Sequence, residues 1–440
     1  MKQFDLIIVG FGKGGKTLAK FASAQGRKVA VIEKSKKMYG GTCINIGCIP
    51  SKTLVHEGLE HGSFEQAFSR KTDVVNALNS KNYHNLADDD NIEVLDYTAK
   101  FKSNHELNLL NDQDEIVGTI GAEQIVINTG AKSMIPAIEG IDSSQYLYDS
   151  EGIMNLKSQP NHLVIVGGGY IALEFAAMFA NFGTQVTVLE RGNDIMTKED
   201  KDIVAEVKKD LADKNVNIVL NADTKKFEDT DKGTIVHTTN GEYAADAVLI
   251  ATGRKPNTDL DLQNTDVKIG DHGEIIVNEY LQTDASNVYA LGDVKGGMQF
   301  TYISLDDFRI VKEQFFGEGK RSTENRGAVP YTVFIDPPLA RVGLTGKEAK
   351  EQGYNIIESA IPVNSIPRHK INNDGRGLFK AVVNKDTEEI LGASLYGLQS
   401  EEIINLIKLA IDQKLSYKVL KDNIYTHPTM VESFNDLFNM

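Results

Sequence analysis

Cysteine is scarce in this sequence, and several other features are missing. The 440 residues contain two cysteines, too few for a framework of structural disulfides. Acidic residues outnumber basic ones by 62 to 47, and the net charge of −15 argues against a nucleic acid as partner. No apolar run approaches the ~18 residues of a membrane span, and the N-terminus lacks the pattern of a signal peptide. We therefore expect a cytoplasmic protein with no membrane partner and no nucleic-acid partner.

Both cysteines lie in one short stretch, residues 40–52, which reads Gly-Gly-Thr-Cys-Ile-Asn-Ile-Gly-Cys-Ile-Pro-Ser-Lys. A few residues separate Cys43 from Cys48, and glycine and proline mark turns around them. Two sulfurs this close in sequence suit a bond that opens and closes, as in a thiol–disulfide exchange enzyme. The pair is therefore predicted to be a redox centre.

A pattern of strand, glycine-rich loop, helix, strand and acid occurs twice. In the first copy an apolar strand runs into Gly10–Gly15, and a second strand ends at Glu33. In the second copy the loop is Gly167–Ala172 and the closing acid is Glu190. Glycines let the backbone approach a pyrophosphate, the helix N-terminus faces the phosphates, and the acid binds a ribose. Two copies therefore predict that the chain binds two dinucleotides.

Gly40–Lys52 resembles the redox motif of the flavoprotein disulfide reductases, the family of lipoamide dehydrogenase, glutathione reductase and mercuric reductase. Two further motifs follow in the family's order. Thr283–Asp293 is similar to the second flavin-binding motif, and His427-Pro428-Thr429 with Glu432 is similar to the C-terminal signature. The resemblance extends over essentially the whole chain. Within the family it is closest to the bacterial reactive-chlorine-resistance proteins that reduce hypothiocyanous acid.

This resemblance implies a homodimer that passes electrons from a nicotinamide through FAD to a disulfide between Cys43 and Cys48. Cys48 would lie beside the flavin, and Cys43 would be the exposed sulfur that attacks the substrate. His427 would reach the cysteines of the other subunit, hold a proton beside Cys43 and protonate the leaving group. Glu432 would orient the imidazole. Dimerisation would therefore complete an active site that the two subunits share.

Other roles carry over from the family by position. Lys52, also counted with the catalytic group, would lie by the flavin ring with Glu174 as its partner, and Tyr170 would cover the nicotinamide pocket. Thr301 would begin a helix whose positive end faces the reduced flavin. The residues expected to bind FAD are Gly10, Gly12, Gly15, Glu33, Lys52, Thr129, Gly130, Gly292, Asp293 and Thr301. Those expected to bind NAD(P)H are Gly167, Gly169, Tyr170, Glu174, Glu190 and Gly253.

The predicted fold class is α/β, with two Rossmann-like dinucleotide-binding domains and a C-terminal α+β dimerisation domain. A chain of this length should divide into about three domains of ~100–200 residues. Strands over 125–127 and 248–250 are expected to close the two nucleotide units, and small antiparallel inserts are expected within 118–130 and 221–243. The expected divisions are an FAD-binding domain with the redox pair (1–148), an NAD(P)H-binding domain (149–265), a segment returning to the flavin (266–327) and a dimerisation domain (328–440).

A metal site is the competing interpretation of the cysteine segment. Cys43, Cys48, His56 and His61 offer four ligands, loosely in the manner of a zinc site. The middle gap is shorter than that of a zinc finger, and coordination would lock both sulfurs out of redox chemistry. We therefore predict no metal site and expect both histidines to be ordinary helix residues.

Differences from better-known members of the family narrow the choice of oxidant. Lys13 and Lys16 place charge in and beside the first glycine loop. A second cysteine pair, which mercuric reductases and high-molecular-weight thioredoxin reductases carry near the C-terminus, is missing here. The resemblance then favours a small oxidant, hypothiocyanous acid or a related reactive chlorine or sulfur species. A lipoamide dehydrogenase-like activity, reduction of Cu(II) or another metal, and a non-catalytic flavoprotein redox sensor stay open as alternatives.

The choice of nicotinamide depends on Glu190. A carboxylate at this position binds a free 2′-hydroxyl and repels a 2′-phosphate, which favours NADH. Arg191 follows it and could accept that phosphate, so NADPH stays possible.

Overall fold

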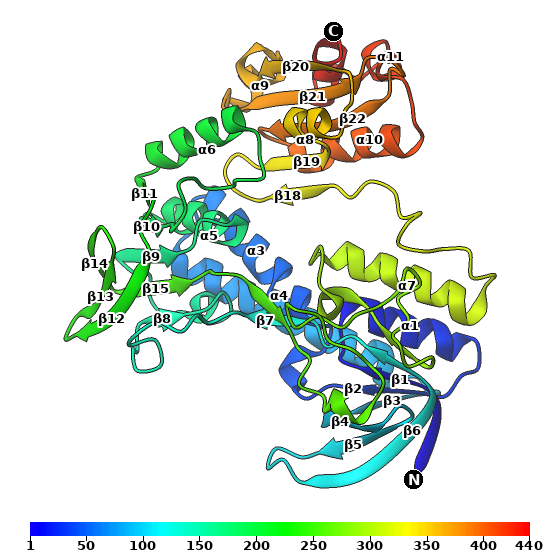
Figure 1. Cartoon of the computed structure of the whole chain (residues 1–440). Coiled ribbons are helices and arrows are strands. Elements are labelled where there is room, and N and C mark those ends of the chain that lie inside the picture. The colour runs from blue at the N-terminus through cyan, green and yellow to red at the C-terminus, as the bar shows by residue number, and fades with distance from the viewer.

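The computed structural model describes residues 1–440 as three units arranged in a column (Figure 1). The first unit is built on a seven-stranded sheet in the order β3-β2-β1-β6-β5-β4, with β17 also paired to β6. Its strands are β1 (Lys2–Val9), β2 (Val29–Ile32), β3 (Ile92–Leu95), β4 (Thr98–Ser103), β5 (Glu106–Leu110), β6 (Ile116–Ile127) and β17 (Val288–Ala290). Its helices are α1 (Lys13–Ala24), α2 (Thr42–Asn45), α3 (Cys48–Leu59), α4 (Phe64–Ala87) and α7 (Thr301–Phe316).

β1 is an almost continuous apolar strand because it lies inside the sheet and is covered on both faces. The consecutive residues Ile7 and Ile8 of β1 are both fully buried, and they belong to two different hydrophobic clusters, one on each face of the sheet. Leu18 of α1 belongs to the same cluster as Ile8. The chain turns from β1 into α1 at Gly10, which has a φ of +100°. A Cβ at Gly10 would lie 2.5 Å from the Asn128 carbonyl oxygen, so this turn requires glycine.

The second unit repeats the parallel arrangement, with a five-stranded sheet in the order β11-β10-β9-β15-β8. Its strands are β8 (Leu147–Tyr148), β9 (His162–Val166), β10 (Gln185–Leu189), β11 (Val216–Val219) and β15 (Ala247–Ile250), and its helices are α5 (Tyr170–Asn181) and α6 (Lys201–Asp213). A separate antiparallel sheet contains β12 (Thr224–Thr230), β13 (Gly233–Thr238) and β14 (Gly241–Ala245). The insert expected within 221–243 is therefore confirmed. The one expected within 118–130 was wrong, because β6 is a single long strand.

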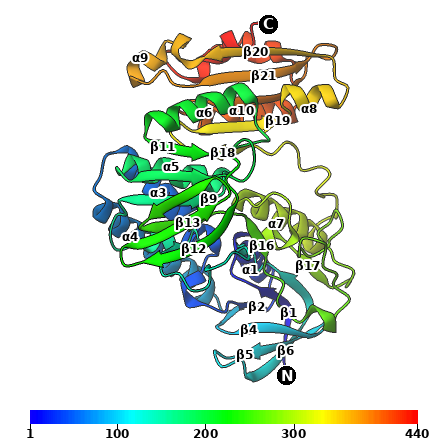
Figure 2. The same ribbon diagram turned by 60° about the vertical axis from the view of Figure 1, so that its left-hand side comes forward.

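The third unit has an antiparallel sheet in the order β18-β19-β22-β21-β20. Its strands are β18 (Tyr331–Val333), β19 (Leu339–Gly343), β20 (Ile356–Pro362), β21 (Leu378–Asn384) and β22 (Ile390–Tyr396). Its helices are α8 (Gly346–Glu351), α9 (Arg368–Asn372), α10 (Ser400–Asp412), α11 (Tyr417–Lys421) and α12 (Phe434–Leu437). Figure 2 shows this sheet at the end of the column opposite the N-terminus.

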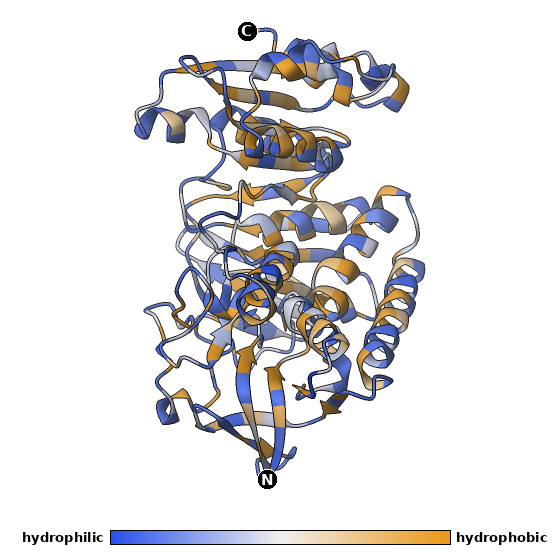
Figure 3. Ribbon diagram, turned by 90° about the vertical axis from the view of Figure 1, so that its right-hand side faces the viewer, coloured by the Kyte–Doolittle hydropathy of each residue, from blue (hydrophilic) through white to orange (hydrophobic).

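Short pairings join the units. β7 (Ala131–Ser133) and β16 (Arg254–Pro256) form a two-stranded antiparallel ladder between the segments that follow β6 and β15. Figure 3 shows hydrophobic colour concentrated on the strands and the helices that cover them, while the connecting loops are mostly hydrophilic. No helix has both the length and the apolar character needed to cross a membrane. The predicted α/β class is confirmed.

One local expectation was wrong. α3 ends at Leu59, so His56 is a helix residue, but His61 lies beyond the helix. His61 has a φ of +57°, and the Gly62 N–H donates to the Glu57 carbonyl oxygen at 3.0 Å. This is the usual closure of a helix C-terminus by a left-handed residue.

Candidate active site

A cleft of 2710 Å³ lies between the three units. The predicted site residues that line it are Gly10, Gly12, Glu33, Cys43, Cys48, Lys52, Thr129, Gly130, Tyr170, Glu174, Asp293 and Thr301. The predicted residues that do not line it are Gly15, Gly167, Gly169, Glu190, Gly253, Gly292, His427 and Glu432. The fold thus brings the cysteine pair to the same cavity as the first glycine loop and the second flavin motif.

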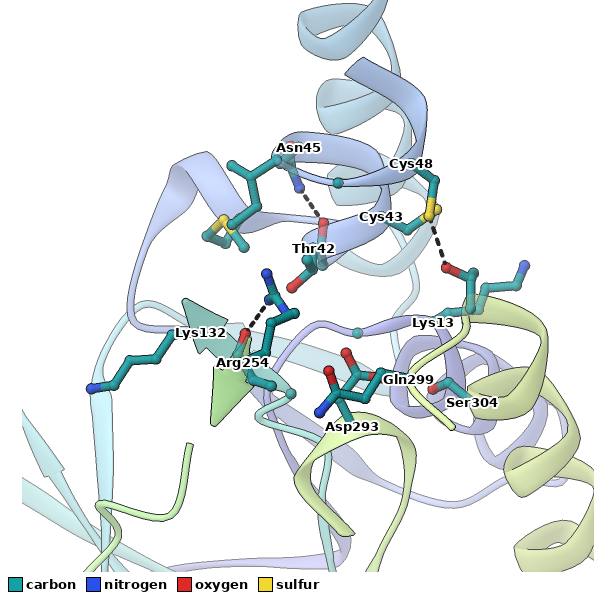
Figure 4. A pocket seen from close by; sticks show the side chains of 18 of the residues that line it. Lys13, Thr42, Cys43, Asn45, Cys48, Lys132, Arg254, Asp293, Gln299 and Ser304 are labelled. Atoms are coloured by element: carbon teal, nitrogen blue, oxygen red, sulfur yellow. Dashed lines mark hydrogen bonds between the residues drawn. The ribbon is translucent and has the colours of Figure 1, made fainter. Parts of the chain in front are cut away.

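The cysteines lie on two consecutive helices at the wall of this cleft (Figure 4). Cys43 is in α2 and Cys48 is the first residue of α3. Both are free thiols, as in the reduced form of the predicted redox pair. Cys48 faces the cleft on the side where the flavin is expected, and Cys43 is half-buried.

The surroundings of the pair favour a thiolate on Cys48. Cys48 Sγ and Thr301 Oγ1, at the first turn of α7, are 3.5 Å apart. A hydrogen bond from Cys43, another from Thr301 and the charge of Lys52 lower the pKa of Cys48 to about 6, against the opposing effect of burial. The hydrogen bond to Cys48 and burial raise the pKa of Cys43. Within one chain the pair therefore keeps its proton on Cys43.

This lowered pKa predicts a thiolate at neutral pH in the reduced protein. Because the pKa of Cys48 is about 6, the thiolate is present above that pH and protonated below it. We expect the ultraviolet absorbance of the thiolate to rise as the pH passes through about 6. This rise should be absent in Cys48→Ser. Lys52→Met should move the midpoint upward because it removes a positive charge. Lys20→Met, at an exposed lysine paired with Asp89, is the matched control and should leave it unchanged.

A midpoint near ~8.5, the ordinary value for a thiol, would contradict this prediction.

Lys52 and Glu174 form an ion pair at the side of the cleft, between helices of two different units. Lys52 Nζ donates to Glu174 Oε2 at 2.6 Å, and the Phe334 N–H donates to Glu174 Oε1 at 2.8 Å. The Lys52 ammonium also lies 4.9 Å from the centre of the Phe334 ring. The predicted partnership of Lys52 with Glu174 is therefore present, and the third unit helps to fix it.

The first glycine loop and Glu33 are shaped to receive a dinucleotide. Gly12 lines the cleft, and a Cβ on it would lie 2.5 Å from Asn128 Oδ1, so the close packing of this loop requires glycine. Glu33 accepts hydrogen bonds from the Phe11 N–H at 3.1 Å and the Ser35 N–H at 3.2 Å. Burial raises the pKa of Glu33, and these N–H groups partly offset it. A carboxylate has about four acceptor sites, so Glu33 retains capacity for a ribose hydroxyl.

The second flavin motif adds a carboxylate to the same cleft. Asp293 lies in the 3₁₀ helix Gly292–Lys295, and Figure 4 shows it at the cleft wall. Burial raises the pKa of Asp293, while the nearby charge of Arg254 lowers it. Gly292, with a φ of +76°, donates its N–H to Asp307 Oδ2 at 2.8 Å, which fixes the turn. A half-buried acceptor facing the cleft fits the hydroxyls of a ribityl chain.

The second glycine loop has the same arrangement as the first. Gly167 has a φ of +114°, and no atom lies within 4 Å of a Cβ position on Gly169, which leaves room for a phosphate. Glu190 accepts from the Gly168 N–H at 2.7 Å and from the Gly192 N–H at 2.6 Å. Its hydrogen bonds thus match those of Glu33 in the first copy.

The turns after the two closing strands are held against each other. Thr129 Oγ1 donates to the Asn257 carbonyl oxygen at 2.7 Å, and the Asn257 N–H donates to the Gly130 carbonyl oxygen at 2.9 Å. Gly253, with a φ of +121°, accepts from the Met134 N–H at 2.9 Å. Thr129, Gly130 and Gly253 therefore join the two nucleotide units, and the first two also line the cleft.

His427 lies outside the cleft that contains the cysteines of its own chain. Its Nδ1 is 2.8 Å from Glu432 Oε2, and Glu432 Oε1 accepts from the Thr429 N–H at 3.1 Å. The predicted pairing of His427 with Glu432 is thus formed. The His427 side chain is 70% exposed, so its second ring nitrogen is open to another molecule. The expected contact with Cys43 is not made within one chain.

Two buried polar residues of this site, Asn128 and Ser304, were not predicted from the sequence, and Lys16 was predicted only as a charge beside the first loop. Asn128 accepts from the Gly15 N–H at 2.9 Å and donates to the Leu291 carbonyl oxygen at 2.8 Å. Ser304 accepts from the Gly14 N–H at 3.1 Å. Lys16 donates to the Gly40 carbonyl oxygen at 3.2 Å, beneath the turn that leads to Cys43. Burial, then Lys13, lower the pKa of Lys16 to about 8. For Asn128 the signal was a polar residue directly after an apolar strand.

The chain belongs to the pyridine nucleotide-disulphide oxidoreductase family. The family model matches residues 4–307, and the model of its dimerisation domain matches residues 329–438. The protein is therefore an oxidoreductase of a family that uses FAD and a pyridine nucleotide, and its dimerisation domain supports a homodimer.

Comparison with individual relatives shows which members of this family the chain is similar to. It is 48% identical to the probable pyridine nucleotide-disulfide oxidoreductase RclA of Escherichia coli, over 100% of both chains. It is 33% identical to a mercuric reductase of Staphylococcus aureus, over 98% of this chain and 81% of the relative. A solved Cu(II) complex of the C43S mutant of E. coli RclA, described as an HOCl-induced flavoprotein disulfide reductase, has a TM-score of 0.98 with 100% of both chains covered. The chain is thus a flavoprotein disulfide reductase similar to RclA.

Proposed function

We propose that this chain acts as a homodimer that uses NADH to reduce hypothiocyanous acid through Cys43 and Cys48. The dithiol is the observation that carries this proposal. Both cysteines of the sequence lie together at the cleft, and their surroundings favour a thiolate on Cys48. An oxidant of the reactive chlorine kind is supported by the 48% identity to a protein described as HOCl-induced.

The residues of the first unit fit FAD. Glu33 would bind the adenosine ribose, the loop from Gly10 to Gly15 the pyrophosphate, and Asp293 the ribityl chain. Thr301 would direct the N-terminus of α7 at the ring, where its partial positive charge favours an anionic form. Bound flavin supplies two-electron transfer between a nicotinamide and a dithiol. Lys52, oriented by Glu174, would place a further positive charge beside that ring and Cys48.

The chemistry at the sulfurs balances with one molecule of oxidant. The Cys43 sulfur attacks the sulfur of hypothiocyanous acid, a Cys43–SCN bond forms, and the hydroxide leaves as water with the proton from Cys43. The Cys48 thiolate then attacks the Cys43 sulfur, forms the disulfide and releases thiocyanate. Both cysteines are oxidised and the oxidant is reduced. His427 from the second subunit would carry the proton from Cys43 to the leaving hydroxide.

Steady-state turnover with NADH tests the oxidant. We expect kcat/KM for hypothiocyanous acid to exceed that for glutathione disulfide and for lipoamide, because a small oxidant needs no built pocket at Cys43. An efficiency no better than that for either disulfide would overturn the assignment and leave only the reductase class.

Reduction of Cu(II) is the second candidate, favoured by the Cu(II) complex of the E. coli relative. In this chain no group of three or more His, Cys, Asp and Glu side chains is placed to hold a metal ion. Turnover of Cu(II) that survives loss of His427 would support this candidate, because metal reduction needs no proton for a leaving group.

We expect NADH to be used in preference to NADPH. The Glu190 carboxylate, fixed by two backbone N–H groups, would accept from a 2′-hydroxyl and repel a 2′-phosphate. Glu190→Ser should reduce the preference for NADH over NADPH by about 10-fold or more, measured as the ratio of the two kcat/KM values. Arg191→Ala is the control and should leave NADH turnover unchanged. Equal use of both cofactors by the unaltered protein would contradict the prediction.

A further inference from the structure

A buried carboxylate, Glu199, connects Tyr170 to the third unit. Glu199 lies between β10 and α6, and its side chain has 0% exposure. Tyr170, the first residue of α5, donates its hydroxyl to Glu199 Oε1 at 2.5 Å. Tyr331 of β18 donates its hydroxyl to the same oxygen. Two phenols from different units thus share one carboxylate oxygen.

The charge of Glu199 is balanced from the third unit. Arg341 Nη1 lies 3.6 Å from Glu199 Oε2 and donates to the Lys198 carbonyl oxygen at 2.6 Å. Arg341 also pairs with Glu348. Burial, followed by the Glu199 charge, raises the pKa of Tyr170 and of Tyr331, so both phenols stay protonated as donors at neutral pH.

Tyr170 and Tyr331 also belong to a row of neighbouring aromatic rings at the cleft. Tyr170 and Tyr331 both line the cleft, and their ring centres are 5.8 Å apart. Tyr331 stacks on Phe300 at 6.1 Å with an angle of 12°, and Phe300 stacks on Tyr302 at 5.1 Å with an angle of 10°. The row ends at the start of α7, beside Cys48. Figures 1 and 2 both place β18 next to α5.

We propose that Glu199 is a positioning residue that holds Tyr170 in a closed position over the nicotinamide site. The inference rests on the proposed function and on the role that the family resemblance implies for Tyr170, which is to cover that site until the nicotinamide enters. Entry must then break a hydrogen bond between a phenol and a buried carboxylate. When a site is open for only a fraction of the time, its apparent affinity for the ligand is reduced to that fraction of the affinity of the open site. Glu199 therefore sets the affinity for the nicotinamide half of the cofactor, and the third unit acts on it through Tyr331 and Arg341.

Tyr170→Phe tests the inference, because it keeps the ring and removes the donor. Calorimetric titration of the FAD-loaded dimer with NAD⁺ should show binding that is tighter by about 10-fold, since a hydrogen bond to a charged group holds the closed state. ADP-ribose, which lacks the nicotinamide ring, should bind equally well before and after the change. Glu199→Gln should tighten NAD⁺ binding in the same direction.

Tyr396→Phe is the matched control. Tyr396 is a buried tyrosine whose hydroxyl donates to the buried Asp210 at 2.7 Å, and it does not line the cleft. Its loss should change neither affinity. Unchanged or weaker NAD⁺ binding in Tyr170→Phe, or equal tightening of ADP-ribose, would overturn the inference.

The two proposals fail separately. If the unaltered enzyme turns over hypothiocyanous acid but Tyr170→Phe binds NAD⁺ no more tightly, the holding role of Glu199 is wrong and the proposed function stands. If Tyr170→Phe tightens NAD⁺ binding but the unaltered enzyme does not reduce hypothiocyanous acid, the assignment of the oxidant is wrong and the role of Glu199 stands.

Discussion

Replacing Cys43 with serine will lower turnover of hypothiocyanous acid by at least about 10³-fold, because serine provides neither the sulfur nucleophile nor the disulfide. NADH should still reduce the enzyme-bound flavin in the first turnover, since the nicotinamide site does not include Cys43. Stopped-flow absorbance separates the reduction of the flavin from the reaction with the oxidant. The solved C43S mutant of the E. coli relative shows that this fold tolerates the change.

The outcome of this experiment distinguishes the alternatives. Cys43→Ser that keeps near-normal turnover of the oxidant would mean that electrons leave the flavin without passing through the dithiol. A metal reductase fed directly by the flavin predicts that result with Cu(II) as acceptor. Cys48→Ser is the companion variant, and it should allow attack by Cys43 but prevent release of thiocyanate through a disulfide.

Replacing His427 with glutamine will lower kcat/KM for the oxidant by about 10²-fold to 10⁴-fold, the usual contribution of a general acid–base group. The residue is 70% exposed and held at Nδ1 by Glu432, which leaves Nε2 to exchange the proton. Steady-state turnover across a range of pH measures the loss. Glu432→Gln should have a smaller effect, because it changes the orientation of the imidazole and not the group that carries the proton.

Mixed dimers test whether His427 acts on the other subunit. A dimer of one Cys43→Ser chain and one His427→Gln chain has one site with both changes and one site with neither. Equal co-expression should therefore restore about a quarter of the wild-type activity, since half of the dimers are mixed and each has one intact site. Activity that stays at the level of the single variants would show that each chain uses its own histidine.

Much of the site could be predicted because its signals are local. The turn at Gly10 requires a left-handed backbone and close approach to Asn128, so glycine is demanded wherever this turn occurs. The same holds for Gly167 in the second copy. The cysteine pair and its turn are likewise contained in a few residues. Local errors also had local causes, as at His61, where α3 ends two residues earlier, at Leu59.

Contacts between units could not be predicted in this way. Glu199 lies in the charged stretch 198–202 of the sequence, yet it is fully buried between Tyr170, Tyr331 and Arg341. Its burial depends on how the third unit docks on the second, which no local pattern encodes.

The sequence by itself determined the two nucleotide units, the redox pair and the C-terminal module, because each is specified by short-range backbone geometry and hydrophobic patterning. The tertiary structure alone decided which side chains meet: the charge of Lys52 beside Cys48, the buried carboxylate on Tyr170, and the placement of His427 outside its own chain's cleft. The physical reason is that pKa values and hydrogen bonds depend on distances and burial across units, which chain order does not specify.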